Sequence, residues 1–215
     1  VGLAAGVGVA EFKAEVARET AAYVGTRAGE TTVVTGAVNL GNKQLNVTSN
    51  APLTATANNF VGGFGLLGGA AASKSTAIVN GQTLAYVGQG AQVNAGNVDV
   101  EAFSTDTAFA KNRVASAAAG VGVKTAQADA TVSSRTEAFI GAYSGTVADI
   151  AAMGVNVGTT GAIVVDADSA MTATAESMGG GFAGGASLSI FKPTATVSGA
   201  TRAYVREGVD VDAYT

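Results

Sequence analysis

Small apolar residues alternate with polar residues along most of the chain. One set of alternate positions from 126 to 140 carries Ala, Val, Ile and small hydroxyl residues, and the set from 125 to 137 carries polar residues that include Arg135 and Glu137. The segment 165–176 alternates in the same way. A period of two is typical of strands that bury one face. The pattern therefore predicts long strands with a solvated outer face and a narrow core of small side chains.

The alternating segments belong to a block of 42 residues that recurs three times without insertion or deletion. The full copies lie at 47–88, 100–141 and 165–206, and a shortened copy occupies 1–25. Only the connectors 26–46, 89–99 and 142–164 vary in length. Because a shift of one residue would turn every side chain to the opposite face, the constant length preserves which face is buried. We expect one repeat array over residues 1–215, with the connectors as loops on one side.

Each copy carries an aromatic residue near its end, at Tyr23, Tyr86, Phe139 and Tyr204. These residues are separated by 63, 53 and 65 positions. The spacing predicts an all-β fold, a repetitive, β-helix-like β-solenoid with coils of about 60 residues. Each repeat has two long strands and a bridge. Such repeats could wind as one wide coil or fold back as stacked hairpins, and the sequence is compatible with both.

The bridges between the two strands of each block are rich in Gly and Ala and lack polar alternation. They lie at 60–72, 115–123 and 178–188. One interpretation is a buried strand or tight bend, where Gly and Ala permit close approach of the backbone. The other is an apolar element that enters lipid or mates with another subunit. The bridges are shorter than the roughly 20 apolar residues that a membrane-spanning helix needs.

Three residues depart from the repeat. Arg18 and Asp106 occupy positions that the pattern assigns to the buried face. Since an unpaired buried charge is costly, we expect these positions to lie near an opening or to find partners. Pro52 falls within a predicted strand. Proline cannot donate to a strand ladder, so it predicts an edge or a bulge in this copy.

The composition argues against an enzyme. The chain has no His and no Cys, which excludes Ser-His-Asp and Cys-His catalysis and the usual zinc sites. Absence of Cys also means that stability comes from stacked strands and not from disulfides. The string Gly63–Gly68 matches a dinucleotide-binding pattern, but the pattern is lost in the other copies of the repeat. The net charge is -4 without a basic stripe, so nucleic acid is not an expected partner.

Two outward-facing patterns are candidate binding features. Acidic pairs at alternate positions could let stacked strands share a calcium ion; these are Asp99 and Glu101, Asp166 and Asp168, and Asp210 and Asp212. A solvated face that discourages edge aggregation is the favoured interpretation, so no cofactor is predicted. Thr pairs could form a hydroxyl ladder for ice or glycan, at Thr54 and Thr56, Thr105 and Thr107, Thr172 and Thr174, and Thr194 and Thr196. Thr is also simply a good strand residue.

The repeat ends in T-x-A-(Y/F)-(V/I), and a short V-x-V-x-A segment follows the last copy at Val209–Ala213. These features resemble the very large repeat exoproteins of bacteria, and in particular the leukotoxin-type filamentous adhesins of anaerobes. The resemblance covers essentially the whole chain through motifs that are largely compositional. It implies secretion across a Gram-negative outer membrane, an elongated β-solenoid, and adhesion or fibre formation at the cell surface. It implies no catalytic residues.

Together these features predict a structural shaft or filament-forming segment of a bacterial cell-surface adhesin. The chain begins without Met inside one repeat and stops inside another, so we expect it to be a piece of a longer extracellular protein. The expected partners are neighbouring repeats or other copies joined end to end, and a host or neighbouring-cell surface. The alternative is a membrane-active or outer-membrane β assembly that uses the Gly/Ala-rich bridges, which leaves membrane contact open.

Overall fold

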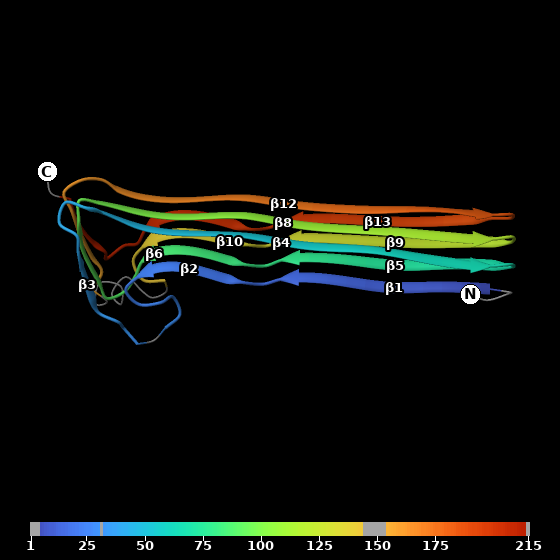
Figure 1. The fold of residues 1–215 in the computed structure, drawn as a ribbon, viewed down its shortest axis with the longest axis horizontal. Helices are drawn as coiled ribbons and strands as arrows, with labels where there is room; N and C mark the ends of the chain where they lie inside the picture. The colour runs from blue at the N-terminus through green and yellow to red at the C-terminus, as the bar shows by residue number, and fades with distance from the viewer. Residues whose placement is uncertain (1–4, 31, 144–153, 214–215) are drawn as a thin grey trace.

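The computed structural model describes residues 5–30, 32–143 and 154–213, and these residues form an elongated molecule built from strands (Figure 1). The strand bounds are β1 Ala5–Val16, β2 Glu19–Val24, β3 Gly36–Asn39, β4 Gln44–Gly65, β5 Gly68–Val79, β6 Gln82–Val87, β7 Ala91–Ala95, β8 Asn97–Ala118, β9 Val121–Val132, β10 Arg135–Ile140, β11 Asn156–Thr159, β12 Ile163–Ala183, β13 Ser187–Val197, β14 Ala200–Val205 and β15 Asp210–Ala213. The long strands, such as β4, β8 and β12, run along the longest axis of the molecule.

The strands form four parallel sheets, which we name A to D. Sheet A has the order β1-β5-β9-β13, sheet B β14-β10-β6-β2, sheet C β15-β11-β7-β3 and sheet D β12-β8-β4. Each strand pairs with its equivalent one repeat away, as Ala77 does with Ala130 in sheet A and Tyr86 with Phe139 in sheet B. The register of every sheet therefore follows the sequence repeat.

The predicted β-solenoid with coils of about 60 residues is wrong. The strands fall into four separate parallel sheets of three or four strands, and the long sheets A and D pack face to face as in a sandwich. The bridges explain the difference, because each block folds back on itself there. Strand β4 ends at Gly65 and β5 begins at Gly68, so two residues reverse the chain and send its two arms into different sheets.

Close approach of the two arms requires glycine near these bends. A Cβ atom on Gly63 would lie 1.8 Å from the carbonyl oxygen of Ala70 on the facing arm. One on Gly6 would lie 1.5 Å from the carbonyl oxygen of Phe64. Neither distance leaves room for any side chain, so the sheets meet backbone to backbone at this end of the molecule.

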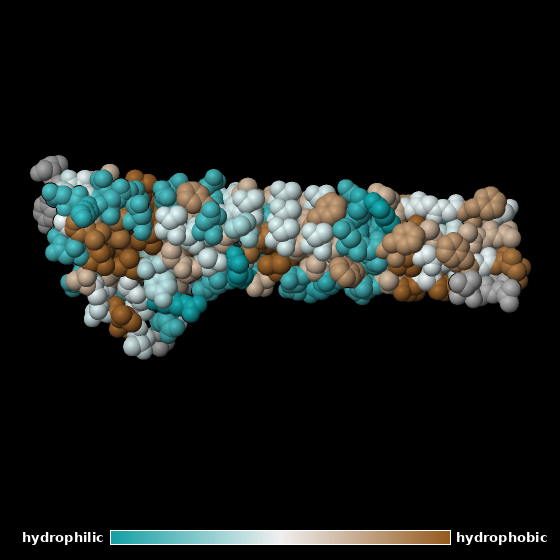
Figure 2. Space-filling view, in the orientation of Figure 1, coloured by the Kyte–Doolittle hydropathy of each residue, from teal (hydrophilic) through white to brown (hydrophobic). Residues whose placement is uncertain are grey.

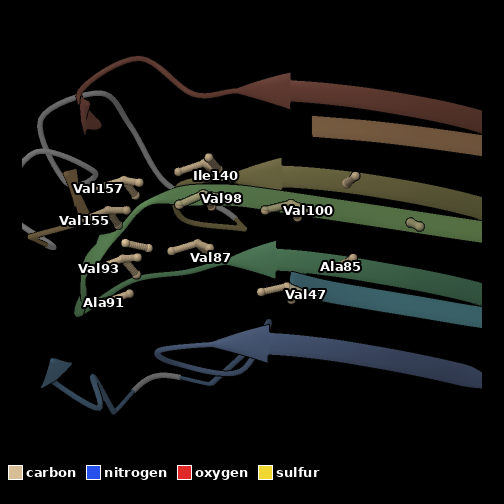
Figure 3. Close-up of a cluster of buried hydrophobic side chains, with 13 residues drawn as sticks. Val47, Ala85, Val87, Ala91, Val93, Val98, Val100, Ile140, Val155 and Val157 are labelled. Atoms are coloured by element: carbon tan, nitrogen blue, oxygen red, sulfur yellow. The ribbon is translucent and has the colours of Figure 1, made fainter. Parts of the chain in front are cut away.

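The core widens with distance from the bends. Between the middle parts of sheets A and D it contains mainly Ala, with Leu53, Val79 and Val132. At the opposite end, Val and Ile side chains from sheets B, C and D fill a thicker core, which includes Val87, Val98 and Ile140 (Figure 3). Along β9 in sheet A the alternation of the sequence is followed closely, since Ala126, Ala128, Ala130 and Val132 are all buried.

The outer face of sheet B differs from the sequence prediction. Glu137 belongs to the set of positions expected to face solvent, yet its exposed fraction is 0%. Residues of the connectors, Ala28 and Tyr143, pack against Leu84, Tyr86 and Phe139 on this face. The connectors therefore fold over sheet B, and residues 144–153 of the predicted connector 142–164 lie outside the described part. The Glu137 carboxylate is 2.6 Å from the Arg135 guanidinium and 3.9 Å from that of Arg202.

The residues that depart from the repeat have different surroundings. Arg18 is exposed, as expected near an opening, whereas Asp106 is only 1% exposed. The Ser104 hydroxyl donates to Asp106 Oδ2 at 3.2 Å. The other carboxylate oxygen, Asp106 Oδ1, and the Ser134 hydroxyl lack hydrogen-bond partners in the described part. The edge position expected for Pro52 is confirmed, because β4 is the last strand of sheet D.

A size match explains why Asp106 stands where it does. In the flanking repeats this position holds Leu53 and Met171, which lie opposite Gly81 and Gly199. A Cβ atom on Gly81 would lie 2.2 Å from Leu53 Cδ1, and one on Gly199 would lie 2.2 Å from Met171 Sδ. The middle repeat has the reverse combination, a smaller Asp106 with the larger Ser134 at the position equivalent to Gly81.

Replacing the middle pair by the flanking combination should stabilise the protein. The double variant Asp106→Leu/Ser134→Gly removes a buried carboxylate and a buried hydroxyl that each leave an oxygen unpaired. We expect its free energy of unfolding to rise by about 1–3 kcal/mol in denaturant titrations. Asp106→Leu alone should gain less, because its side chain would meet Ser134. A double variant less stable than the native chain would contradict this account of the pair.

A buried amide lies between the Ala-rich middle of the core and its thin end. The Asn112 side chain is 0% exposed. Its amide nitrogen donates to the carbonyl oxygens of Ser73 at 2.6 Å and Gln127 at 2.7 Å, and its oxygen accepts from the Ser73 hydroxyl at 2.6 Å. Asn59, one repeat earlier, donates to the same hydroxyl at 2.9 Å. The amides therefore tie sheets A and D together.

We expect Asn112→Ala to lower the free energy of unfolding by about 2–4 kcal/mol, because it leaves buried backbone carbonyl oxygens without a donor. Asn58→Ala is the control, since that amide lies on the exposed face of β4 and its loss should change stability by less than about 0.5 kcal/mol. Thermal or urea unfolding of the two variants measures the difference. Equal effects would show that the buried amide has no special role.

Candidate functional site: the open edges of the sheets

The acidic residues proposed from the sequence do not converge. Glu101 on β8 lies beside Asp166 on β12, but Asp99 lies beside Val164 and Asp168 beside Phe103. Asp210 and Asp212 belong to the separate sheet C. In the described part of the chain, no group of three or more His, Cys, Asp or Glu residues is placed to hold a metal ion. Asp99 instead accepts a hydrogen bond from the Gln44 side-chain amide. A calcium site has no geometric support here.

The other two sequence patterns also fail to form a site. Gly63–Gly68 spans the bend between β4 and β5, with a strand after it where dinucleotide binding requires a helix. Thr54, Thr107 and Thr172 do align across sheet D, but Phe109 stands between Thr56 and Thr174 in the next outward row. The hydroxyl ladder is therefore interrupted after one row. Among the described residues, no helix is long and apolar enough to cross a membrane.

A shallow hollow lies on the outer face of sheet C, at the end of the molecule away from the bends. Amide and carboxyl side chains line it, together with small apolar ones; its polar members are Asn39, Gln92, Asn94, Asn156 and Asp210. It contains no nucleophile paired with a base. The hollow offers hydrogen-bonding groups but no arrangement for chemistry.

The two ends of the sheets present unpaired strands. At one end these are β1, β2, β3 and β4, and at the other end they are β13, β14, β15 and β12. No further strand pairs with them within residues 5–30, 32–143 and 154–213. Each end therefore presents a row of free backbone N–H and C=O groups from sheets A, B and D, which is a template for another strand. We take these two edges as the candidate functional site.

A ladder of aromatic rings runs between the two edges. The ring centroids of Tyr23 and Tyr86 are 5.3 Å apart, those of Tyr86 and Phe139 4.8 Å, and those of Phe139 and Tyr204 5.3 Å. All three pairs stack with interplanar angles of 8° or less. The sequence repeat identified these four residues, and the strand register turns them into one stack. Tyr23, at one end of the stack, is 43% exposed.

The two inner rungs of the ladder are held by the connectors. The Ala28 N–H donates to the Tyr86 hydroxyl at 2.5 Å, and Tyr143 packs on Phe139 with a centroid distance of 6.0 Å. Burial raises the pKa of Tyr86 from its ordinary value of 10.0 to about 12. Burial and the nearby Glu137 carboxylate raise the pKa of Tyr204. Sequence reasoning missed these contacts because they depend on where the irregular connectors fold.

We expect the Tyr86 proton to be retained between pH 10 and pH 12, where an unfolded chain has lost it. The folded state binds more protons in this window, so stability falls as pH rises through it. Tyr86→Phe should remove the last step of tyrosinate absorbance in a titration and reduce the loss of stability. Tyr23→Phe, at the exposed end, is the control. A late step that persists in Tyr86→Phe and vanishes in Tyr23→Phe would contradict the assignment.

No protein family, no curated protein and no solved structure matches this chain.

Proposed function

We propose that the chain is a structural segment of a cell-surface shaft or filament, in which further repeats or further copies continue the four sheets end to end. The observation that carries the proposal is that the two open edges complement one another in register. In sheets A, B and D, the edge strand at one end and the edge strand at the other end are equivalent strands of different repeats. The pairing that joins neighbouring repeats inside the chain therefore also applies between copies.

In sheet A, the internal register would place β13 of one copy against β1 of the next. Inside the chain, Val121 pairs with Gly68 and Gly122 pairs with Ser187. If the same register continued between copies, Leu188 would lie beside Val7, and Ile190 would lie beside Val9. All four side chains are exposed in the single chain. Burying such side chains against one another is favourable at roughly 25 cal/mol for each Å² of apolar surface removed from water.

The same register brings opposite charges together. Lys192 of one copy would lie beside Glu11 of the next. Inside the chain Glu11 already contacts Lys74 of the neighbouring strand at 3.7 Å, and Lys111 contacts Glu176 across β8 and β12 at 2.6 Å. Cross-strand ion pairs are therefore a regular feature of the stack, and the contact between copies would repeat them.

Sheets B and D give further matches. Tyr204 would stack on Tyr23 and extend the aromatic ladder. In sheet D, Phe182 would lie beside Phe64, and both are at least half exposed in the single chain. Aromatic pairs of this kind contribute about 0.5–1.5 kcal/mol beyond the area that they bury.

Two prolines limit the backbone pairing at the edges. Lys43 C=O accepts from Gly96 N–H, and because successive residues of a strand face alternate neighbours, the nitrogen of Pro52 faces the open edge of β4. Ser198 N–H donates to Val132 C=O, so the nitrogen of Pro193 faces the open edge of β13. Each proline removes one hydrogen bond from a stack and leaves the remaining outward groups of these long strands available.

A surface location and an adhesive role rest on the resemblance to repeat exoproteins. The geometry adds that stacking presents each connector on the same side of the assembly, where a host or neighbouring-cell surface could be contacted. Catalysis plays no part in this proposal. The function is mechanical, because each added repeat pairs the free edge of the one before it.

Blocking one edge should stop the stack. Ala200 N–H donates to Ser134 C=O, so alternate residues of β14 face β10 and the N–H of Ala203 faces the open edge. Ala203→Pro removes this donor without breaking a bond inside the chain. We expect it to raise the concentration needed for assembly by about tenfold or more, measured by sedimentation and by electron cryo-microscopy of rods with an axial spacing of about 4.8 Å.

Ala203→Ser is the matched control, because it keeps the N–H group and should assemble like the native chain. Both variants should unfold at nearly the same temperature as the native chain, since the edge is not part of the core. A native chain that stays a single particle at all concentrations would contradict stacking between copies. Assembly of Ala203→Pro at the native concentration would contradict pairing through this edge.

A further inference from the structure

The end of the molecule that carries the bends has its apolar side chains on the outside. We call this end the apolar tip, and it comprises residues 5–10, 60–73, 114–123 and 178–191. Its interior is narrow, since a Cβ atom on Gly6 or Gly63 would lie within 2 Å of a carbonyl oxygen on the facing sheet, and only a small cluster that includes Val61, Ala71 and Val114 is buried there. Figure 2 shows apolar residues over much of this end, on the right of the view.

Large apolar side chains cover both outer faces and the bend itself. Leu66 and Leu67 at the first bend are 60% and 73% exposed, and Phe182 near the last bend is 72% exposed. Phe64 on sheet D and Val9 and Leu188 on sheet A are also exposed. A globular core has the opposite arrangement, with small or polar groups outside and large apolar groups inside.

A collar of charged side chains marks where the apolar tip ends. The collar lies about seven residues from the bends on both faces, which is roughly 20 Å along a strand. Its members are Lys74, Lys192 and Glu11 on sheet A and Lys111, Arg113 and Glu176 on sheet D. Within the tip ranges no residue is charged. Lys124 follows the range 114–123 and lies beside Ala71 and Ser189 of the tip, but its side chain is buried between the sheets and 5% exposed.

The charge of the collar is opposite in sign to that of the whole chain. The collar contains four cationic side chains and two carboxylates, so it is positive overall, whereas the whole chain carries a net charge of -4. A positive collar around an apolar end is complementary to a partner that has an apolar interior and a negatively charged surface layer. Anionic phospholipid has this arrangement, and each basic residue near such a surface contributes about 1 kcal/mol of attraction.

The shape of the tip also favours lipid over a second protein surface. The tip is thin between its two sheets, whose backbones approach closely, and it is apolar on two opposite faces and at its end. A flat protein surface could cover only one of these faces, whereas a fluid lipid phase encloses all of them. We propose that the end of the apolar tip inserts into the interface of an anionic lipid membrane, with the charged collar facing the headgroups from the water side.

The structure limits the depth of insertion. The roughly 20 Å between the bends and the collar exceeds the roughly 15 Å of hydrocarbon in one leaflet, so only the outermost part of the tip can be buried in lipid. The open edges of β1, β4, β12 and β13 carry unpaired backbone groups, which are not tolerated in hydrocarbon. A single copy is therefore confined to the wet interface, where helices and other amphipathic elements bury their apolar faces by about 5–10 Å.

Vesicle flotation with two paired variants tests the proposal. Leu66→Ser/Leu67→Ser removes exposed apolar side chains from the tip, and Val33→Ser/Val34→Ser removes exposed ones from a connector at the other end. With vesicles of phosphatidylcholine and phosphatidylglycerol, we expect the tip variant to bind about tenfold more weakly than the native chain. The connector variant should bind like the native chain. Equal binding by all three chains would overturn the proposal.

A second measurement reports the position of the tip directly. The chain has no Trp, so Leu67→Trp supplies a single probe, and Val34→Trp is its control. We expect a blue shift of the emission on adding vesicles for Leu67→Trp alone. No shift, or the same shift in both, would overturn insertion. Association of chains without vesicles that the Ser substitutions at the tip abolish would identify a second copy as the occupant instead.

The inference goes beyond the stacking function and can fail independently of it. Ala203→Pro, which should block stacking, leaves the tip unchanged. We expect this variant to keep its vesicle binding at the level of the separate native chain. Vesicle binding that disappears in Ala203→Pro while Leu66→Ser/Leu67→Ser binds normally would show that lipid contacts the sheet edges and would overturn the role of the tip.

Discussion

Parallel pairing of each strand with its equivalent one repeat away is the constraint on which the rest of the structure depends. It sets the register of all four sheets, and through the register it stacks like side chains into rows. The aromatic ladder, the buried amides and the cross-strand ion pairs all follow from these rows. Because the same pairing is unused at both ends, the constraint that builds the chain also leaves two edges that can take a further repeat.

The thickness of the core changes along the molecule, and this change separates three regions. Val and Ile fill the wide end, Ala fills the middle, and at the bends glycine lets the backbones meet. Asn112 lies where the middle gives way to the thin end, and its hydrogen bonds tie the two sheets together there. The space between the sheets at the bends is too narrow for large side chains. The large apolar side chains of this region therefore lie on the outer surface and form the apolar tip.

The two proposals concern surfaces at right angles to one another. Stacking uses the strand edges and would lengthen the assembly across the strands, while lipid contact uses the ends of the strands. In a stack the tips of successive repeats would form a continuous apolar ridge. Neighbouring copies would also pair the backbone groups of the edge strands, which would allow the ridge to enter lipid more deeply than a single tip can.

The sequence by itself determined the strands, the repeat, the inward and outward faces and the aromatic residue of each repeat, because period-two alternation and constant block length constrain these directly. It also restricted Pro52 to an edge or a bulge. It did not determine the winding: two arms joined by a Gly-rich bridge fit one wide coil as well as a folded-back pair, and only close backbone contact at residues such as Gly63 decided for facing sheets. Burial of Glu137 and the separation of the acidic pairs likewise depended on tertiary structure, since connectors without a repeating pattern cover one sheet and strand register sets which carboxylates meet.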